Sequence, residues 1–171
     1  MLKFEPRLNQ HKAKHFVGDK SAFTIIEVVL VLAIAGLIFL MVFIALPALQ
    51  RNQRDTQRKN DLSRALTAVQ NYQSNNKGSM PWNLFNTTLY NNYLNTGGDT
   101  FKDPDGENYI FYGDLSIGNL PNSRKSADGK TLICVFKSGK CDGERTVSAG
   151  GDNKVALSMV LEGGGVYCVN N

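Results

Sequence analysis

The pattern of apolar and polar residues changes sharply along this chain of 171 residues. Residues 1–22 are polar and charged, without the apolar stretch that an ordinary secretion signal needs. A run of 19 residues without a polar side chain follows, from Val28 to Leu46. At about 1.5 Å of rise per residue, a helix of this length matches the ~30 Å hydrocarbon core of a bilayer. The pattern therefore predicts one transmembrane helix near the N-terminus.

A helical pattern continues beyond Pro47, where the chain becomes polar. Apolar residues recur there at spacings of three and four: Leu62, Ala65, Leu66, Val69 and Tyr72. They form one apolar stripe that stops before the turn-forming residues 74–79. We expect one helix from about residue 23 to residue 75, hydrophobic all round in its first half and amphipathic in its second. The second half needs a surface to pack on.

The rest of the chain predicts a small globular domain. Residues 80–95 carry aromatic and aliphatic side chains at roughly helical spacing, with Pro81 suited to a first helical turn. Four short segments rich in Val, Ile, Tyr and Phe are typical of strands: Asn108–Tyr112, Thr131–Lys137, Lys154–Glu162 and Gly165–Val169. The expected fold class is α+β, with an antiparallel sheet of three or four strands packed on the amphipathic half-helix.

Charge is concentrated at the N-terminal end of the chain. The net charge is +4, and residues 1–22 hold five basic and two acidic residues, a net charge of +3. The basic excess is therefore a membrane-topology signal rather than a sign of nucleic-acid binding. The basic stretch 51–64 could contact DNA, but Asp55 and Asp61 interrupt it, and we favour a solvated helix face. Nucleic acid remains an unsupported partner.

Three cysteines, Cys134, Cys141 and Cys168, lie within the last 40 residues, without a C-x-x-C motif or a histidine beside them. This pattern favours a disulfide in an oxidising compartment over a metal site, and so places the C-terminal part outside the cytoplasm. The pairing stays open. Cys168 could pair with either of the others, or Cys134 could pair with Cys141 within a hairpin.

The junction between the basic leader and the apolar run has the sequence SAFTIIE, residues 21–27. It resembles the type IV pilin and type II secretion pseudopilin family, in which a small residue and then Phe-Thr-x-x-Glu open a transmembrane helix. Ala22 stands where the family usually has Gly, and Phe23, Thr24 and Glu27 match residue for residue. Further along, the helix is expected to break at Gly36, common in the family, and at Pro47, three residues later than the usual proline.

The resemblance implies a type IV pilin-like fold and four parts: a cytoplasmic leader, 1–22; a transmembrane and filament-core helix, 23–49; an amphipathic half-helix, 50–75; and a globular domain, 76–171. It implies cleavage between Ala22 and Phe23, N-methylation of Phe23, and polymerisation into a surface filament. Implied partners are other copies of the chain, the membrane before assembly, a prepilin peptidase and methyltransferase, an assembly ATPase and a polytopic platform protein.

Glu27 carries the mechanistic hypothesis, because a carboxylate at the centre of a bilayer costs on the order of 3 kcal/mol and less near an end. It could complement the positive N-terminus of its own helix. We favour pairing with the α-amino group of Phe23 in a neighbouring subunit, which would select register in the filament. Thr24 is assigned to assembly with it.

Other candidate sites have weaker sequence signals. The segment from Asp103 to Tyr109 resembles the Asp-Pro-x-Gly-x-x-Tyr loop of major pseudopilins, and Asp103 and Asp105 are candidate calcium ligands, although we favour an ordinary turn. The glycines 163–165 are interpreted as a hairpin turn. His11 and His15 both lie in the leader, so histidine-based catalysis is excluded from the trimmed chain.

The sequence therefore predicts a structural subunit of a filament, with no enzymatic activity and no cofactor. A major pilin is favoured over a minor pilin or a pseudopilin of secretion or DNA uptake. A single-pass anchored binding module that keeps its leader is the alternative from another class.

Overall fold

The computed structural model describes residues 23–98, 100–113 and 123–171. The chain divides into two units, residues 1–41 and 42–171. Helix α1 extends over Ile25–Asn75 and belongs to both. The expected breaks at Gly36 and Pro47 do not interrupt it, since both residues lie inside the helix. A proline removes one N–H donor and crowds one carbonyl of the preceding turn, and the hydrogen bonds on either side can carry the helix past it.

The first unit consists, as far as it is described, of the apolar start of α1. Its side chains are exposed, apart from partly covered Ala35, and exposure continues through Leu49. The helix contains an 18-residue window long and apolar enough to cross a membrane, and none of that window is buried within the chain. An isolated helix that is apolar on every side needs a lipid or protein environment.

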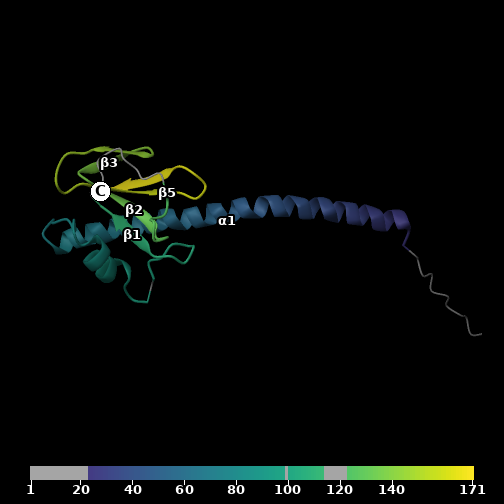
Figure 1. Ribbon diagram of the computed structural model, residues 1–171, viewed down its shortest axis with the longest axis horizontal. Helices are drawn as coiled ribbons and strands as arrows, with labels where there is room; N and C mark the ends of the chain where they lie inside the picture. Colours follow the sequence, from purple (N-terminus) through teal and green to yellow (C-terminus); the bar gives the residue numbers. More distant parts are fainter. Residues whose placement is uncertain (1–22, 99, 114–122) are drawn as a thin grey trace, which may run out of the picture. The chain divides into compact units, whose positions relative to one another are not determined.

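The second unit contains the sheet, and Figure 1 shows β1, β2 and β5 beside the C-terminal half of α1. The four-stranded sheet has the order β1-β2-β5-β6, and a separate hairpin pairs β3 with β4. The strands are β1, Tyr109–Tyr112; β2, Thr131–Lys137; β3, Gly139–Asp142; β4, Arg145–Ser148; β5, Val155–Val160; and β6, Val166–Asn170. The predicted α+β class and a four-stranded sheet packed on the long helix are therefore confirmed.

The sheet is mixed, so the prediction of a purely antiparallel sheet was wrong at one edge. Strand β1 runs parallel to β2, with Tyr109 opposite Thr131, whereas the β2–β5 and β5–β6 pairs are antiparallel. Parallel neighbours need a connection of a dozen or more residues, and residues 113–130 are long enough to provide it. The glycines 163–165 lie between β5 and β6, in the hairpin turn expected there.

Strands β2 and β5 are buried on both faces. On one face, Ile133, Val135 and Leu157 join the main core with the apolar stripe of α1. On the other face, Cys134 and Phe136 pack in a second, smaller cluster that the β3–β4 hairpin helps to cover through Cys141. The sequence did not predict this hairpin, because its two four-residue strands contain no apolar run.

The predicted helix after Pro81 takes an unusual form. Element η1, Phe85–Leu94, is a π-helix, in which the Leu89 N–H donates to the carbonyl of Leu84 five residues earlier, at 2.9 Å. The wide turn places Phe85, Leu89 and Leu94, spaced by four and five residues, in the main core. The polar stretch between these anchors is thereby turned outward.

Candidate functional site

The resemblance at the N-terminal end rests on residues at the very start of α1. Ala22 and the leader, residues 1–22, lie outside the described residues. Phe23 is 80% exposed and precedes the first helical turn. Thr24 caps the helix: its side-chain oxygen accepts from the N–H of Glu27 at 3.3 Å, and its carbonyl accepts from the same N–H at 3.1 Å.

Thr24 and Glu27 therefore match the sequence of a helix-capping box, Thr-x-x-Glu. Of the two hydrogen bonds that define such a box, the one from the Glu27 N–H to the Thr24 side chain is present. This gives Thr24 a structural role in starting the helix, beside the assembly role proposed for it from the sequence. Glu27 is exposed, as the side chains around it are. Its carboxylate is consequently open to a partner outside the chain.

The most heavily bonded polar group of the second unit is the guanidinium of Arg58, whose side chain is fully buried. It donates to both carboxylate oxygens of Asp103, through Nε and Nη2, each at 2.9 Å. Its Nη1 donates to Asp55 at 2.9 Å and to Glu162 at 3.0 Å. A bidentate arginine–carboxylate pair is the strongest of these contacts. Arg58 therefore links α1 to two separate turns of the domain.

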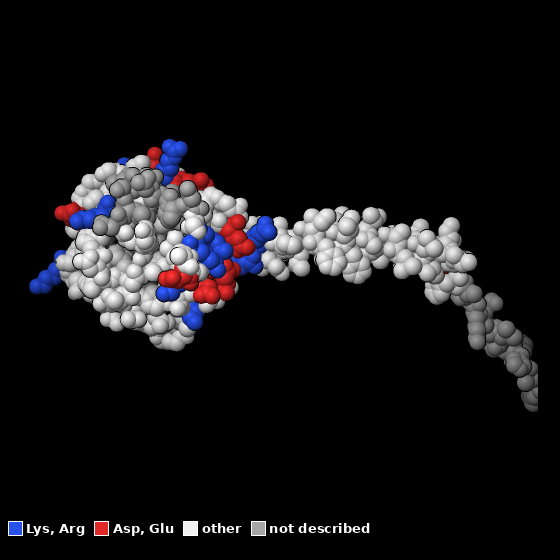
Figure 2. All heavy atoms as spheres, viewed as in Figure 1, with Lys and Arg blue, Asp and Glu red and all other residues white. Residues whose placement is uncertain are grey.

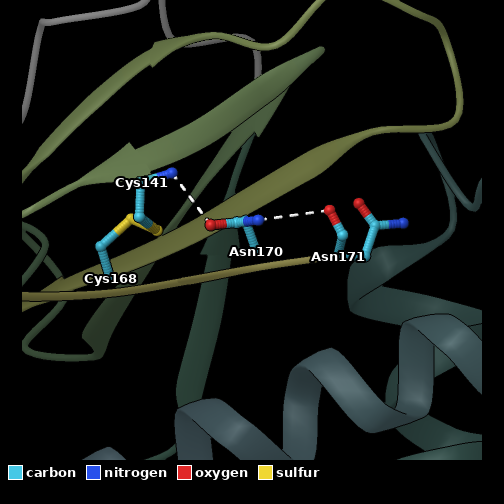
Figure 3. The surroundings of a disulfide bond; sticks show 4 residues. All are labelled: Cys141, Cys168, Asn170 and Asn171. Carbon is cyan, nitrogen blue, oxygen red and sulfur yellow. Dashed lines mark hydrogen bonds between the residues drawn. A yellow bond between two sulfur atoms is a disulfide. The ribbon is translucent and has the colours of Figure 1, made fainter.

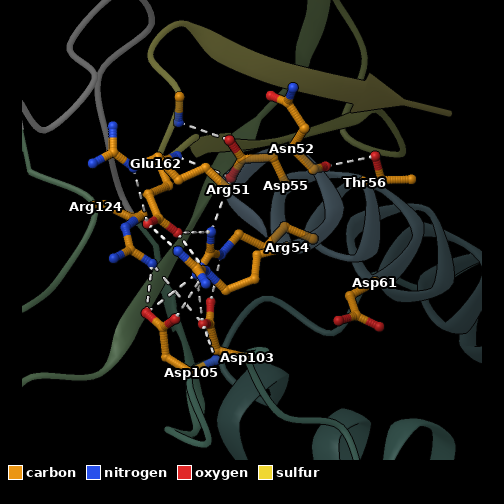
Figure 4. Close-up of polar contacts among 12 residues, drawn as sticks. Arg51, Asn52, Arg54, Asp55, Thr56, Asp61, Asp103, Asp105, Arg124 and Glu162 are labelled. Carbon is orange, nitrogen blue, oxygen red and sulfur yellow. Dashed lines mark hydrogen bonds and ion pairs between the residues drawn. The ribbon is translucent and has the colours of Figure 1, made fainter. Parts of the chain in front are cut away.

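More charges surround this centre, and together they form the Arg58 cluster: Arg54, Asp55, Arg58, Asp103, Asp105, Arg124, Lys125 and Glu162. Figure 4 labels all of them except Arg58 and Lys125. Arg54 donates to Glu162 at 2.8 Å, and Arg124 donates to Asp105 at 3.0 Å. Asp55 also accepts from the backbone N–H groups of Glu162 and Gly163, at 2.9 and 2.7 Å. Figure 2 shows acidic and basic atoms intermingled in a patch on one face, as expected where such pairs reach the surface.

The Arg58 cluster corrects one interpretation of the sequence. The basic stretch 51–64 is not simply a solvated face, because Arg58 is buried and Arg54 is paired with Glu162. Asp55, Arg58 and Asp61 are spaced by three residues and extend the buried side of the helix beyond its apolar stripe. This spacing is the signal that could have identified them.

The candidate calcium ligands lie in the same cluster. Asp103 is buried against Arg58, and its Oδ1 also accepts from the backbone N–H of Asp105 at 2.9 Å, which closes the turn. Asp105 lies 3.2 Å from Arg58 as well as beside Arg124. Arginine side chains thus occupy the carboxylates that a cation would need. Within the described ranges, no group of three or more Asp, Glu, Cys or His side chains is placed to hold a metal ion.

Hydrogen bonds decide the pKa values in this cluster. Pairing with Arg54 and Arg58 lowers the pKa of Glu162 to about 2. Burial alone would raise the pKa of Asp55 and of Asp103, but their hydrogen bonds outweigh it and both pKa values lie below the ordinary range. Asp61 differs, because burial raises its pKa even though the Tyr109 hydroxyl donates to it at 2.9 Å.

The disulfide joins Cys141 of β3 to Cys168 of β6, with a Cα–Cα distance of 5.8 Å (Figure 3). It fastens the small hairpin to the edge of the sheet, and the N–H of Cys141 also donates to the side chain of Asn170 at 3.0 Å. This resolves the pairing that the sequence left open. A bond of this kind typically contributes about 2–5 kcal/mol to the stability of a small domain.

Cys134 is the remaining thiol and is buried. It lies opposite Ser158 on β5, which in turn lies opposite Cys168 on β6. Two strand spacings of about 4.8 Å therefore separate Cys134 from Cys168, too far for a disulfide. Burial also raises the pKa of the Cys134 thiol to about 12, so it is a poor nucleophile.

Comparison of the chain with protein-family models, with curated proteins and with solved structures gives no match. The function is therefore inferred from the residues and their geometry alone.

Replacement of Arg58 by methionine should destabilise the domain by about 3–5 kcal/mol, because it leaves Asp103 buried without its cation. Urea unfolding of the detergent-solubilised chain, followed through the fluorescence of its single tryptophan, Trp82, measures this effect. The matched control is Arg51→Met on the same helix, where the side chain is 58% exposed and should contribute less than about 1 kcal/mol. The double variant Arg58→Met/Asp103→Asn should recover part of the loss. Equal effects of the two single variants would contradict this account of Arg58.

Stability should fall in acid. Asp55, Asp103 and Glu162 have lower pKa values in the folded than in the unfolded chain, so their contribution is present above about pH 4 and is lost toward about pH 2. Asp61, with its raised pKa, acts in the opposite direction and offsets only part of the loss. The urea midpoint should therefore decrease between about pH 5 and pH 2.5, and less steeply in Glu162→Gln. A midpoint that rises over this range would contradict the assignment.

Proposed function

We propose that this chain is a prepilin, a structural subunit of a type IV pilus-like filament. Its leader is removed between Ala22 and Phe23, Phe23 is N-methylated, and the trimmed chain polymerises through residues 23–49. The partners are the peptidase and methyltransferase, an assembly ATPase and a platform membrane protein. The subunit resides in the cytoplasmic membrane before assembly and in a surface filament afterwards.

One observation carries the proposal: the motif of residues 21–27 leads directly into an apolar helix without a covering partner in the described chain. Residues 28–46 expose apolar side chains on every side. A bilayer satisfies such a helix while the subunit is a monomer, and equivalent helices of other subunits can do so in a filament. A membrane anchor alone explains the apolar run, but not the matching residues at its start.

Glu27 supports the same proposal because burying its carboxylate without a partner would cost free energy. Among equivalent apolar helices its carboxylate would lose water, and an unpaired buried charge is strongly destabilising. The α-amino group created at Phe23 is a cation of the right kind, on a residue that is exposed. Pairing between subunits would penalise a misplaced neighbour more than it adds net stability.

The second unit is compatible with an extracytoplasmic location. Its disulfide is typical of an oxidising compartment, and no described charge of the Arg58 cluster lacks a partner. A pseudopilin is the second candidate, favoured by one observation. The two ends of the loop that resembles pseudopilins both bind α1, Asp103 through Arg58 and Tyr109 through Asp61.

The N-terminus of the chain in its native cell tests the proposal. Mass spectrometry of sheared surface filaments should find a chain that begins at an N-methylated Phe23. Its abundance in the filament separates a major subunit from a minor one. Detection of the chain only in the membrane fraction, with residues 1–22 still attached, would instead identify an anchored module and end the filament proposal.

Two substitutions separate the capping role of Glu27 from its charge. Glu27→Gln keeps a side chain that can complete the capping box but loses the carboxylate, whereas Glu27→Ala loses both. We expect both variants to be cleaved normally and neither to enter filaments, as measured by immunoblotting of sheared and membrane fractions. Glu144→Gln, at another exposed carboxylate, is the matched control and should assemble. Normal assembly of Glu27→Gln would show that the charge is dispensable.

A further inference from the structure

A groove of about 360 Å³, here called the α1–η1 groove, is lined by one face of α1 and by the C-terminal end of η1. Its described lining residues are Asn60, Ser63, Arg64, Thr67, Ala68, Asn71, Tyr93 and Leu94. The members from α1 recur at spacings of three and four residues, which places them on the same side of the helix. The groove follows this side from Asn60 to Asn71, over about 16 Å of helix axis.

The two ends of the groove carry side-chain amides without a partner. Asn60 and Asn71 are exposed, and neither side chain forms a hydrogen bond with any described residue. Each amide offers one carbonyl acceptor and two N–H donors. Between them, the hydroxyls of Ser63 and Thr67 donate to the backbone carbonyls of Lys59 and Ser63, each at 3.0 Å. The hydroxyl protons are thus used within the helix, and the two oxygens remain available as acceptors.

An aromatic ring on the opposite wall is held in place. Tyr93 packs edge-to-face on Tyr72, with the ring centroids 5.8 Å apart, and its hydroxyl accepts from the side chain of Asn75 at 3.3 Å. Ala68 and Leu94 are buried and give the groove a short apolar floor. A ring beside such a floor can pack on the C–H groups of a ligand while the amides and hydroxyls meet its polar groups.

The charge of the groove is nearly balanced. Arg64 is the one charged residue of the described lining, and its Nη1 lies 3.4 Å from a carboxylate oxygen of Asp61. Its guanidinium also lies over the ring of Phe101, 5.7 Å from the centroid. An anionic or cationic ligand would therefore gain little, and an apolar ligand would leave the polar groups without partners. A neutral ligand with many hydroxyl groups can satisfy them.

The polar residues of the groove are poor choices for the stability of a helix. Asn, Ser and Thr favour helices less than Ala, Glu or Lys, because their short side chains compete for backbone hydrogen bonds. Asn60, Ser63, Thr67 and Asn71 nevertheless lie inside α1, at exposed positions where packing does not require them. Their presence is explained by binding better than by folding.

We propose that the α1–η1 groove binds a neutral oligosaccharide. The amides of Asn60 and Asn71 each pair with neighbouring hydroxyl groups of the sugar, as donor to one and acceptor from the other. The oxygens of Ser63 and Thr67 accept from further hydroxyls, and the ring of Tyr93 packs on the C–H groups of one sugar ring. The volume of the groove suits about two sugar rings and lies within the range of small-molecule sites.

Three neutral disaccharides serve as probes: maltose, cellobiose and N,N′-diacetylchitobiose. Each is titrated into the 15N-labelled full chain in micelles of a zwitterionic detergent, which has no sugar headgroup, and is followed by amide NMR. We expect at least one of them to shift the side-chain signals of Asn60 and Asn71, with a dissociation constant on the order of 1 mM. No shift of these signals with any disaccharide, or a larger shift with inorganic phosphate at equal concentration, overturns the proposal.

Alanine variants test the amides without breaking the helix. Asn71→Ala should weaken binding of the disaccharide about tenfold, and the double variant Asn60→Ala/Asn71→Ala about a hundredfold. Gln70→Ala is the matched control, because Gln70 is exposed beside Asn71 but does not line the groove. It should leave the affinity unchanged. An unchanged affinity in Asn71→Ala, or an equal loss in Gln70→Ala, contradicts the assignment.

Urea unfolding of the double variant separates a binding role from a structural one. Since alanine favours helices more than asparagine, the double variant should unfold at the same or a higher urea concentration than the unchanged chain. A clearly lower midpoint would show that the two amides serve the fold, and would overturn the assignment. None of these measurements depends on filament assembly, so the groove and the filament proposal stand or fall separately.

Discussion

A buried guanidinium constrains the second unit more than any other polar group, because a charge removed from water must be surrounded by acceptors. Arg58 obtains these acceptors from Asp55 on its own helix, Asp103 after η1, and Glu162 in the turn between β5 and β6. Segments more than 40 residues apart are thereby brought to one point. Such a cluster adds little net stability over an apolar core of equal volume, but its loss is costly and it permits one register. Arg58 fixes how the helix sits on the sheet at one end of the core.

Different interactions hold the elements that cover the two faces of the sheet. On the helix side, the apolar stripe that includes Leu62 and Val69 packs on alternate residues of β2 and β5, and the Arg58 cluster continues the same side of α1 where the stripe ends. On the other side, the β3–β4 hairpin has too few apolar residues to hold itself in place, and the Cys141–Cys168 bond does so. Hydrophobic contact thus specifies the large interface, while a covalent bond secures the small one.

The sequence predicted what depends on local periodicity and composition and could not predict what depends on distant partners. The stripe from Leu62 to Tyr72 was identified because a helix face repeats locally, and the strands were identified by their content of Val, Ile, Tyr and Phe. Arg58 was misjudged because only Asp103 and Glu162, far along the chain, distinguish a buried arginine from a solvated one. The parallel β1 edge, the π-helical turns of η1 and the choice of Cys141 as disulfide partner likewise follow from three-dimensional packing. At the N-terminus, the motif of residues 21–27 was visible at once, but the capping bond from Glu27 to Thr24 required the structure.

Helix α1 therefore carries two kinds of residue: those with an interaction partner in the described chain and those without one. From residue 51 onward, the arginines that would otherwise bind lipid phosphate or a partner have carboxylates of the same chain beside them. From residue 23 to residue 49, apolar side chains and the carboxylate of Glu27 have no described partner. In a filament subunit of the kind proposed, this division means that the charges of the Arg58 cluster need no partner from a neighbouring subunit. Assembly would then be selected by the apolar helix and Glu27.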